Sequence, residues 1–498
     1  MDEQALRIHP DRETHRELAR DWPLVPMWTE LTADVSTPVG VFPELAGEGP
    51  GVILESVERS ERWGRYSFVA GDPAAIVTVD PGGLHVTRLT RDLGIEERPG
   101  PATDALKALA ARLRAPHLPG LPPLTGGLVG YLSYEAAMLL DDLPYPEGGD
   151  LHCPPIELLV MDQAVVFDQW LQRLLLIAHV KEYDEGVAAL EHLAKHIRDA
   201  RTPEPLPLRE EAVMSDFASP SDADRFRESV VEAKEHIFAG DIFQVVLARR
   251  RSAAAPQGGL PIYRRLRVAN PSPYMFFLRT PDLELAGSSP EPLVRVEGRR
   301  VSTRPIAGTF PRGRTPEEDA HLEQRLLADD KERAEHAMLV DLSRNDLGRV
   351  CSAGTVEVTE LMTVERFSRV MHIVSTVEGE LGKDSSALDA LAATFPAGTV
   401  TGAPKRRAME IIAESEPVAR GPYAGAVGYL TFAGDLDFCI TIRTAVIANG
   451  AAYVQSGAGV VADSDPDREL AETEAKASAL LAAVGGSFVE PERIGATP

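Results

Sequence analysis

The chain has 498 residues, of which 44% are hydrophobic and 26% charged, with a formal net charge of −25. This ordinary globular composition predicts two or three domains, or two halves that share one intertwined core. The excess of acidic residues excludes a general surface for nucleic acid or for an anionic membrane, because both carry negative charge. An anionic small molecule would need a local basic pocket.

Cysteine usage and the N-terminal segment predict a reduced, cytoplasmic protein. Three cysteines without Cys-x-x-Cys spacing argue against a disulfide scaffold and a thiolate zinc site. The first 20 residues are charged and lack an apolar core, so we expect no signal peptide. No apolar stretch approaches the length of a membrane span, so we expect no membrane partner.

Residues 37–200 alternate short β-branched runs with turns, a pattern typical of strands. The predicted strands are 52–54, 66–69, 75–79, 158–160, 164–167 and 174–179, the last three as a meander. A helix is predicted over 187–200. Proline, acidic residues and serine are frequent over 201–222, which indicates a linker. We therefore expect an N-terminal domain over 1–205 and a second domain over 215–498.

Helical signals are stronger in the second half. The predicted elements are a helix over 222–239 that Gly240 ends, a strand over 241–251, and a helical region over 315–347 broken near 329–330. Asp465 and Pro466 suit the N-cap and first turn of a final helix. Because strands and helices do not alternate strictly, the pattern favours an α+β fold over a doubly wound sheet.

Charged residues gather on one face of the final helix. Glu469, Glu472 and Lys476 are three and four residues apart and therefore share this face. Taken alone, such a group is more often a solvated face with one weak Glu–Lys pair than a site.

Two further carboxylates, Glu332 and Glu335, lie beside an apolar stripe of the predicted helical region. A carboxylate in that position costs on the order of several kcal/mol unless a charge or a metal compensates it. A salt bridge to Arg325 or Arg333 is an equally good interpretation. With the pair on the final helix, however, four hard oxygen ligands without a His/Cys cluster favour Mg²⁺ over Zn²⁺.

Three glycine-rich segments expose backbone N–H groups where a carboxylate could dock, at 305–309, 395–405 and 457–459. None has P-loop spacing, and any one alone is more often a plain turn. The last segment is expected as a loop after a strand, 439–443, that carries Arg443. Lys405, Arg443 and Lys476 could supply the basic pocket.

Two residues have both a structural and a catalytic interpretation. His372 lies in an apolar run, where a core histidine is the more common case. Glu291 follows a turn and is either a turn carboxylate or an acid of raised pKa.

Together these segments resemble the chorismate-utilising enzymes, and within them the anthranilate synthase component I group. The motifs are PIAGTFPRG at 305–313, ERAEHAMLVDLSRNDLGR at 332–349, MHIVS at 371–375, FPAGTVTGAPK at 395–405, GPYAGAVGY at 421–429, CITIRTA at 439–445, QSGAGVVADSDP at 455–466 and ELAETEAKA at 469–477. They follow the family order over about 240–480.

The resemblance implies an α+β fold with a large antiparallel, sandwich-like β core and outer helices. It implies Mg²⁺-dependent conversion of chorismate and ammonia to anthranilate and pyruvate, with Mg²⁺ held by Glu332, Glu335, Glu469 and Glu472. The implied substrate-binding residues are Gly308, Thr309, Thr399, Tyr423, Arg443, Gly457, Ala458 and Gly459. Catalytic roles fall to Glu291 as the acid for the departing 4-hydroxyl, His372 in the second step, and Lys476 nearby.

Two positions separate reactions within the family. Gln244 stands where the water-adding members have lysine, and a glutamine cannot act as base toward water. Ala307 stands where aminodeoxychorismate synthases have a lysine that could capture the ring. Both favour anthranilate. The alternatives are an aminodeoxychorismate or aminodeoxyisochorismate synthase, and a non-catalytic regulator that binds chorismate or tryptophan.

Ammonia and regulation imply two more partners. None of the cysteines lies in the glycine-rich elbow of a glutaminase, so we expect a separate glutamine amidotransferase subunit, component II. Ser56, Pro273, Tyr274 and Met275 resemble the segments that bind tryptophan as feedback inhibitor. Plain core packing is the other interpretation of Tyr274 and Met275.

Overall fold

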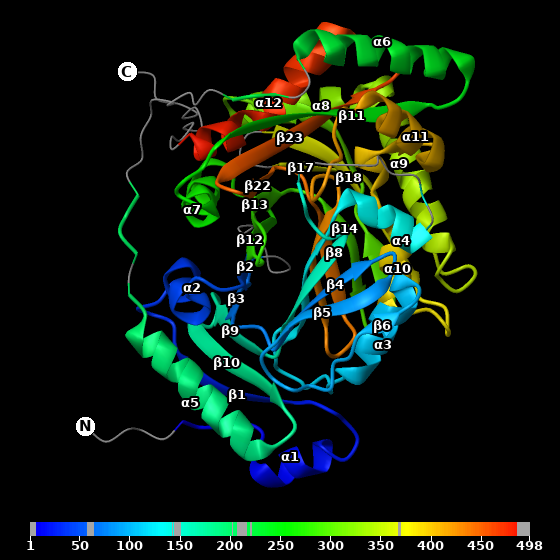
Figure 1. Cartoon of the computed structure of the whole chain (residues 1–498). Helices are drawn as coiled ribbons and strands as arrows, with labels where there is room; N and C mark the ends of the chain where they lie inside the picture. Colours follow the sequence, from blue (N-terminus) through cyan, green and yellow to red (C-terminus); the bar gives the residue numbers. More distant parts are fainter. Residues whose placement is uncertain are drawn as a thin grey trace.

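The computed structural model describes residues 6–56, 64–141, 143, 151–201, 203–206, 217–219, 222–366 and 370–485. Within these ranges the chain forms two antiparallel sheets, of 11 and 12 strands, with helices on their outer faces (Figure 1). The α+β fold with a sandwich-like β core is thereby confirmed.

The first sheet contains, in spatial order, β1 (Val25–Thr32), β10 (Arg173–Val180), β9 (Gln163–Asp168), β3 (Tyr66–Gly71), β2 (Gly51–Glu55), β12 (Tyr274–Arg279), β13 (Glu284–Ser289), β22 (Thr444–Ala448), β23 (Ala451–Val460), β11 (Gln244–Ala254) and β19 (Gly402–Ala403).

The second sheet contains β16 (Ile306–Pro311), β18 (Val370–Glu380), β15 (Arg300–Thr303), β14 (Pro292–Glu297), β21 (Leu436–Ile440), β20 (Ala426–Thr431), β7 (Gly127–Leu132), β8 (Ile156–Met161), β4 (Ala75–Asp80), β5 (Gly83–Leu89) and β6 (Arg98–Pro99), and β17 (Glu357–Arg366) pairs with β18.

A continuous apolar layer fills the space between the sheets. Phe276 and Leu285 of the first sheet belong to the same buried cluster as Tyr131 and Val427 of the second. Alternate residues of these strands point to opposite faces, so the outward-facing apolar residues need helices to cover them.

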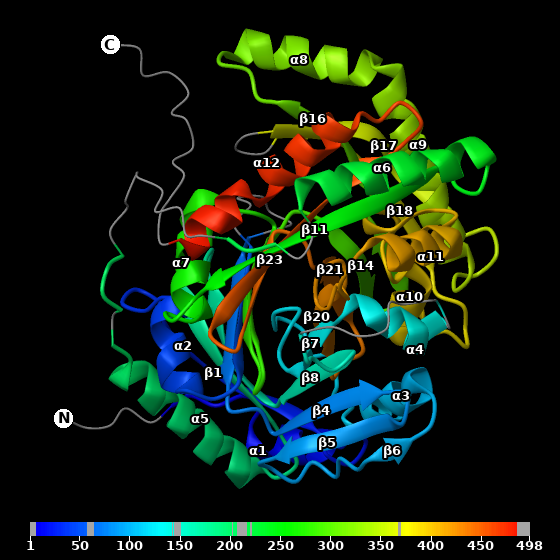
Figure 2. The same cartoon turned by 45° about the horizontal axis from the view of Figure 1, so that its top comes forward.

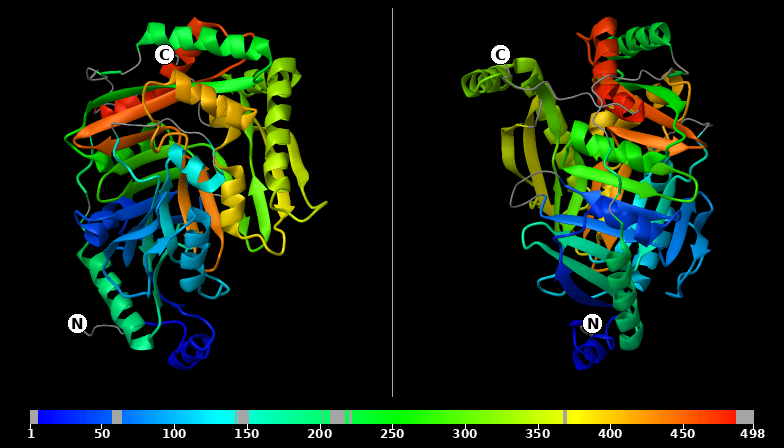
Figure 3. Two further views of the ribbon diagram at one scale, coloured as in Figure 1. Left: turned by 45° about the vertical axis from the view of Figure 1, so that its right-hand side comes forward. Right: turned by 90° about the vertical axis from the view of Figure 1, so that its left-hand side faces the viewer.

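Helices supply those covers on both sides (Figure 3). The first sheet is covered by α2 (Pro38–Ala46), α5 (Tyr183–Asp199), α7 (Gly259–Ala269) and α12 (Pro466–Val484), and the second by α3 (Ala102–Arg112) and α10 (Ala387–Thr394). The other helices are α1 (Arg12–Leu18), η1 (Tyr134–Ala136), α4 (Ala137–Asp141), α6 (Ala223–Ala239), α8 (Pro316–Ala328), α9 (Asp330–Gly348), η2 (Gly398–Val400) and α11 (Lys405–Ser415).

Helix boundaries follow the capping signals of the sequence. Asp222 caps α6, which ends at Gly240 in the left-handed conformation with φ of 85°. Asp329 accepts from the backbone of α9 and produces the expected break after α8. Asp465 caps α12. Across the described residues, no helix combines the length and the apolar character that crossing a membrane requires.

The predicted meander over 158–179 is wrong in its first member. Strands β9 and β10 pair in the first sheet, but β8 pairs with β4 and β7 in the second. The chain crosses between the sheets at Asp162, whose buried carboxylate accepts from Arg91 Nε at 2.8 Å. This ion pair joins segments about 70 residues apart, which local patterning does not reveal.

Strands from both halves of the chain are neighbours in both sheets. In the first sheet β2 pairs with β12, and in the second β7 pairs with β20. The segments 1–205 and 215–498 therefore share one pair of sheets, while their division into two domains stays a prediction.

Candidate active site

Most of the predicted catalytic and metal-binding residues are carried by elements that meet at one end of the molecule, where α12 lies along β23 and β11 (Figure 2). Helix α9 packs against β16 and β18 at the same end. The two helices that carry the four glutamates thus flank strands that carry Gln244, Gly308 and His372.

Glu472 of α12 repels Glu332 and Glu335 of α9 across the gap between the two helices, and it repels Glu469 on its own helix. Burial raises the pKa of Glu335, of Glu332 and of Glu469, and the charge of Glu472 raises each of them further. Lys331 partly opposes these shifts. The site therefore holds excess negative charge that a cation would relieve.

In the part of the chain that the structure describes, neither Glu332 nor Glu335 forms the predicted ion pair with Arg325 or Arg333. Glu335 Oε1 accepts a long hydrogen bond from Gln244 Nε2 at 3.5 Å, and Arg325 lies over the Phe310 ring instead. Glu472 pairs with Lys476 at 2.6 Å, which is the Glu–Lys pair expected on the final helix.

The donor set has the chemistry that Mg²⁺ prefers, because it consists of carboxylate oxygens that repel one another. Within the described residues, no three His, Cys, Asp or Glu side chains are gathered closely enough to enclose an ion. The four glutamates therefore fit Mg²⁺ by their chemistry. Glu332 and Glu335 lie on α9, and Glu469 and Glu472 lie on α12.

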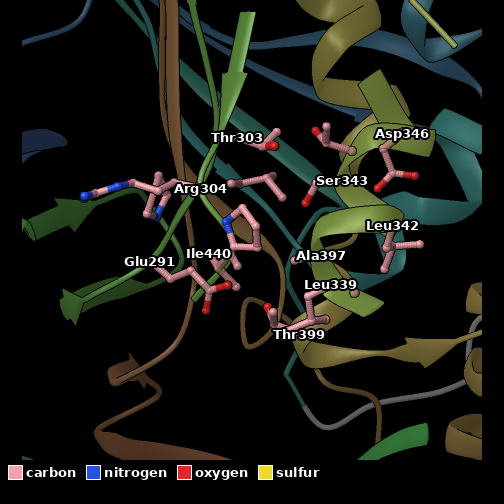
Figure 4. A pocket seen from close by; sticks show the side chains of 15 residues that line it. Glu291, Thr303, Arg304, Leu339, Leu342, Ser343, Asp346, Ala397, Thr399 and Ile440 are labelled. Carbon is pink, nitrogen blue, oxygen red and sulfur yellow. The ribbon is translucent and has the colours of Figure 1, made fainter. Parts of the chain in front are cut away.

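Glu291 lies between β13 and β14 at the edge of a cavity of about 40 Å³. Figure 4 shows its carboxylate at the same end of the cavity as the Thr399 hydroxyl. Burial raises the pKa of Glu291 to about 8, against the opposing effects of Thr399 and Lys476. Glu291 is therefore protonated at neutral pH and can donate a proton.

His372 lies on β18, where its backbone pairs with Thr309 of β16. Burial, together with the positive charges of Arg443 and Lys476, lowers the pKa of His372 to about 4, against the opposing effect of the Gly308 backbone. The imidazole is consequently neutral at pH 7 and can accept a proton. The side chain of Thr309 lies outside the described part.

The sequence predicted that Arg443 ends a strand over 439–443, and this prediction is wrong. Arg443 instead lies where the chain crosses from one sheet to the other. Strand β21 ends at Ile440 in the second sheet, and β22 begins at Thr444 in the first. Arg443 adopts a φ of 51°, which is uncommon for a residue with a side chain and frequent at functional sites. The pKa of Arg443 is lowered by burial, with opposing effects from Tyr423 and Glu472.

The predicted loop at Gly457, Ala458 and Gly459 is wrong, because these residues lie inside β23 and pair with β11. Glycine is needed there for close approach: a Cβ on Gly457 would lie 2.9 Å from the Tyr423 hydroxyl, and one on Gly459 would lie 2.7 Å from Gln244 Nε2. Lys476 Nζ donates to the Gly457 carbonyl oxygen at 3.1 Å.

Gly308 lies beside the glutamates. It adopts a φ of 71° at an irregularity in the pairing of β16 with β18. A Cβ there would lie 3.2 Å from Glu332 Oε2. Lys405, expected in the basic pocket, instead pairs with Asp346 at 3.4 Å.

Gln244 is 4% exposed at the first position of β11. Its Oε1 is buried and has no hydrogen-bond partner among the described residues. An unused acceptor beside the glutamates is thus available to an N–H donor.

The four residues of the predicted tryptophan segment also come together. Met275 of β12 pairs with Glu55 of β2, which places Tyr274 next to Ser56. The Tyr274 hydroxyl donates to Asp437 Oδ1 at 2.9 Å. Pro273 and Met275 are buried. The Ser56 hydroxyl is buried and has no hydrogen-bond partner among the described residues.

One charged residue of this region was missed by the sequence analysis. Arg420 is 1% exposed, and its guanidinium carbon lies 5.7 Å from the centre of the Tyr423 ring. The available signal was an arginine directly before the glycine-rich motif at 421–429, where a surface position is the usual expectation.

Comparison with known proteins agrees with this geometry. A family model described as chorismate binding enzyme matches residues 68–482. The chain belongs to this family. Anthranilate synthase component 1 of Acetivibrio thermocellus is 42% identical over 488 residues, 96% of this chain and 98% of the relative. The Streptomyces coelicolor protein of the same name is 46% identical over 500 residues, 97% and 93% of the two chains.

Two solved structures share the fold of this chain. Anthranilate synthase component I from Streptococcus pneumoniae is 36% identical with a TM-score of 0.75, over 91% of this chain and 99% of that one. The menaquinone-specific isochorismate synthase from Escherichia coli is 20% identical with a TM-score of 0.69, over 95% of this chain and 98% of that one. At this identity the similarity is evidence for the fold and not for the function.

Proposed function

We propose that this chain converts chorismate and ammonia to anthranilate and pyruvate, as component I of an anthranilate synthase. The observation that carries the proposal is Gln244 beside the glutamates. Its amide has no basic group to activate water, and its unused Oε1 can accept from an N–H of ammonia. The names of relatives 42% and 46% identical over nearly the whole chain support the same reaction.

Binding would use opposite charges for the two substrate carboxylates. Arg443, the Tyr423 hydroxyl and the backbone of Gly457–Gly459 would hold the pyruvyl carboxylate. Glu332, Glu335, Glu469 and Glu472 would hold Mg²⁺, which when bound supplies positive charge for the ring carboxylate. The low exposure of Tyr423 and Gln244 would exclude water from the ring.

The chemistry then needs one acid and one base. Ammonia adds at C2 of chorismate while the C4 hydroxyl leaves as water with the proton of Glu291, and the added nitrogen then releases one proton, which restores the Glu291 acid. His372 accepts the C2 proton as the C3–O bond breaks, and the released enolpyruvate takes up a proton to become pyruvate. The protonation states of Glu291 and His372 at neutral pH suit these roles.

Anthranilate fluorescence tests the proposal. Purified protein with chorismate, an ammonium salt and Mg²⁺ should form anthranilate and one equivalent of pyruvate, and EDTA should stop both. Intact chorismate would contradict the enzymatic role and favour a binding regulator. Loss of chorismate to an amino-deoxy product without pyruvate would point to an aminodeoxychorismate or aminodeoxyisochorismate synthase.

Ammonia would come from a separate glutamine amidotransferase subunit in the cytoplasm. The relatives' name, component 1, supports a second component, and three unpaired cysteines support a reducing compartment. Addition of that subunit with glutamine should replace ammonium salt in the assay. Unchanged dependence on ammonium salt would contradict this partnership.

Tryptophan would act as feedback inhibitor at Ser56, Pro273, Tyr274 and Met275. The buried hydroxyl of Ser56, which lacks a partner in the described residues, supports a ligand there. Ser56→Ala should raise the tryptophan concentration for half-inhibition, whereas Ser67→Ala on neighbouring β3 should not. Identical inhibition of both variants would contradict the assignment.

A further inference from the structure

Arg420 is the most deeply buried large charged side chain near the site, at 1% exposure. It lies after α11 and forms a two-point ion pair with Glu416: Nε donates to Oε2 at 2.9 Å and Nη2 to Oε1 at 2.5 Å. Its remaining hydrogen bonds go to backbone carbonyls, from Nη1 to Val400 at 2.7 Å and from Nη2 to Val246 at 2.8 Å.

Those carbonyls belong to two segments that carry site residues. Val400 directly follows Thr399, whose hydroxyl lies at the Glu291 end of the cavity. Val246 lies two residues after Gln244 on β11, and Glu416 Oε1 also accepts from Ala248 N at 2.9 Å on that strand. One ion pair therefore ties the Thr399 segment to the Gln244 strand.

The same guanidinium supports Tyr423. It lies 5.7 Å from the Tyr423 ring and 4.7 Å from the Tyr134 ring. Glu135 accepts from the backbone of Arg420 at 2.9 Å and of Gly421 at 3.2 Å, which holds this turn against η1. The Tyr423 hydroxyl in turn lies close to Gly457, where a Cβ would be 2.9 Å from it.

Stability alone is a poor explanation for this arrangement. A buried ion pair often contributes little net stability, because desolvation of the two charges offsets their attraction. What a planar, forked guanidinium supplies is several directed hydrogen bonds at fixed angles. Among the described residues, every side-chain hydrogen bond of Arg420 goes to Glu416 or to one of the two segments described above.

We infer that Arg420, held by Glu416, is a positioning residue that keeps Thr399, Gln244 and Tyr423 in one arrangement for the reaction. It touches neither substrate nor reacting atoms and acts from behind the site. The inference rests on the proposed function, and it adds a residue whose role none of the site motifs implied.

Arg420→Lys tests the inference, since lysine keeps the charge but cannot reach Glu416, Val400 and Val246 together. We expect kcat for anthranilate to fall about 10-fold or more, because displacement of reacting groups by about 1 Å can cost on the order of 100-fold. The KM for chorismate should rise less than kcat falls. The matched control is Arg65→Lys, which alters a similar two-point pair, at 3.0 and 2.8 Å, between the residue before β3 and buried Asp168 at the end of β9.

A merely structural role predicts a different result. Arg420→Lys would then lower the melting temperature as Arg65→Lys does and leave kcat per folded molecule unchanged, which would overturn the inference. If Arg420→Lys does not fold, the charge-neutral pair Glu416→Gln with Arg420→Gln replaces it, with the same expectation for kcat. A wild type that forms no anthranilate would defeat the proposed function first, so the two failures are distinguishable.

Discussion

At the scale of single residues, the site depends on groups that burial moves away from their ordinary protonation states. Burial raises the pKa of Glu291 to about 8 and lowers that of His372 to about 4. At neutral pH Glu291 is therefore an acid and His372 a base. The proposed reaction needs both, because it protonates a leaving group and later removes a proton.

The first prediction concerns Glu291 and pH. Because its carboxyl is protonated below about pH 8, kcat should be highest below that value and should fall as the pH rises through it. Glu291→Gln should lower kcat about 100-fold or more and remove this limb of the profile. Glu297→Gln on β14 is the control and should keep the wild-type profile, which is measured from anthranilate fluorescence between pH 6 and 9.5. An alkaline limb that persists in Glu291→Gln would refute the assignment.

The second prediction concerns the glutamates. Glu335→Gln removes one of the four carboxylates and should abolish anthranilate formation. It should also weaken Mg²⁺ binding in calorimetric titration, a readout independent of turnover. Glu474→Gln on α12, which pairs with Arg251 at 3.0 Å, should change neither. Wild-type turnover in Glu335→Gln would rule out the proposed metal site.

At the scale of elements, the glycines of β23 are defined by what faces them. Side chains normally stabilise a strand by packing, and glycine lacks one, so glycines at 457 and 459 should weaken β23. They are needed there because Tyr423 and Gln244 approach the backbone closely. The strand thus serves as a wall of the site at the cost of some strand stability.

The third prediction follows from this wall. Gly459→Ala places a methyl group 2.7 Å from Gln244 Nε2, so the amide must turn away. Because the contact is with the end of a side chain, we expect a small change in melting temperature but a fall in kcat/KM of about 10-fold. Gly348→Ala has open space around its Cβ and is the control. Equal kcat/KM in both variants would contradict the role given to Gly459.

At the scale of the whole molecule, both sheets are assembled from strands that are far apart in the sequence. Pairing of β2 with β12 and of β7 with β20 joins residues more than 200 positions apart. Removal of either half would leave open edges in both sheets and would expose part of the apolar layer between them.

The fourth prediction is that fragments 1–205 and 215–498 do not fold separately. Each should be insoluble or lack a cooperative thermal transition when expressed alone, because each loses its partners in both sheets. Expression of the two fragments together should restore a soluble complex, as judged by size-exclusion chromatography and circular dichroism. A cooperative transition in isolated 215–498 would instead support an independent domain.

Local physical chemistry explains which parts of this molecule could be predicted from the sequence. Capping residues such as Asp222 and Asp465 act within one turn, so the bounds of α6 and α12 followed from them. Spacing along a helix likewise placed each glutamate pair on one face. The motifs of the resemblance then brought Glu291, Arg443 and the glycines into one proposed site.

Tertiary structure decided what depends on partners distant in sequence. The points at Asp162 and Arg443 where the chain passes from one sheet to the other were not predicted. An apolar strand has the same sequence pattern in either sheet, so the pattern does not show which sheet the strand joins. Residues 457–459 of β23 were predicted as a loop, since small residues are frequent in turns. In this strand small residues are needed because neighbouring side chains approach the backbone closely. Arg420 was not singled out, because only the folded chain brings Glu416, Val246 and Val400 around it. The sequence by itself determined the chemical groups of this protein, and the tertiary structure determined which of them are buried together and hence what their protons and charges can do.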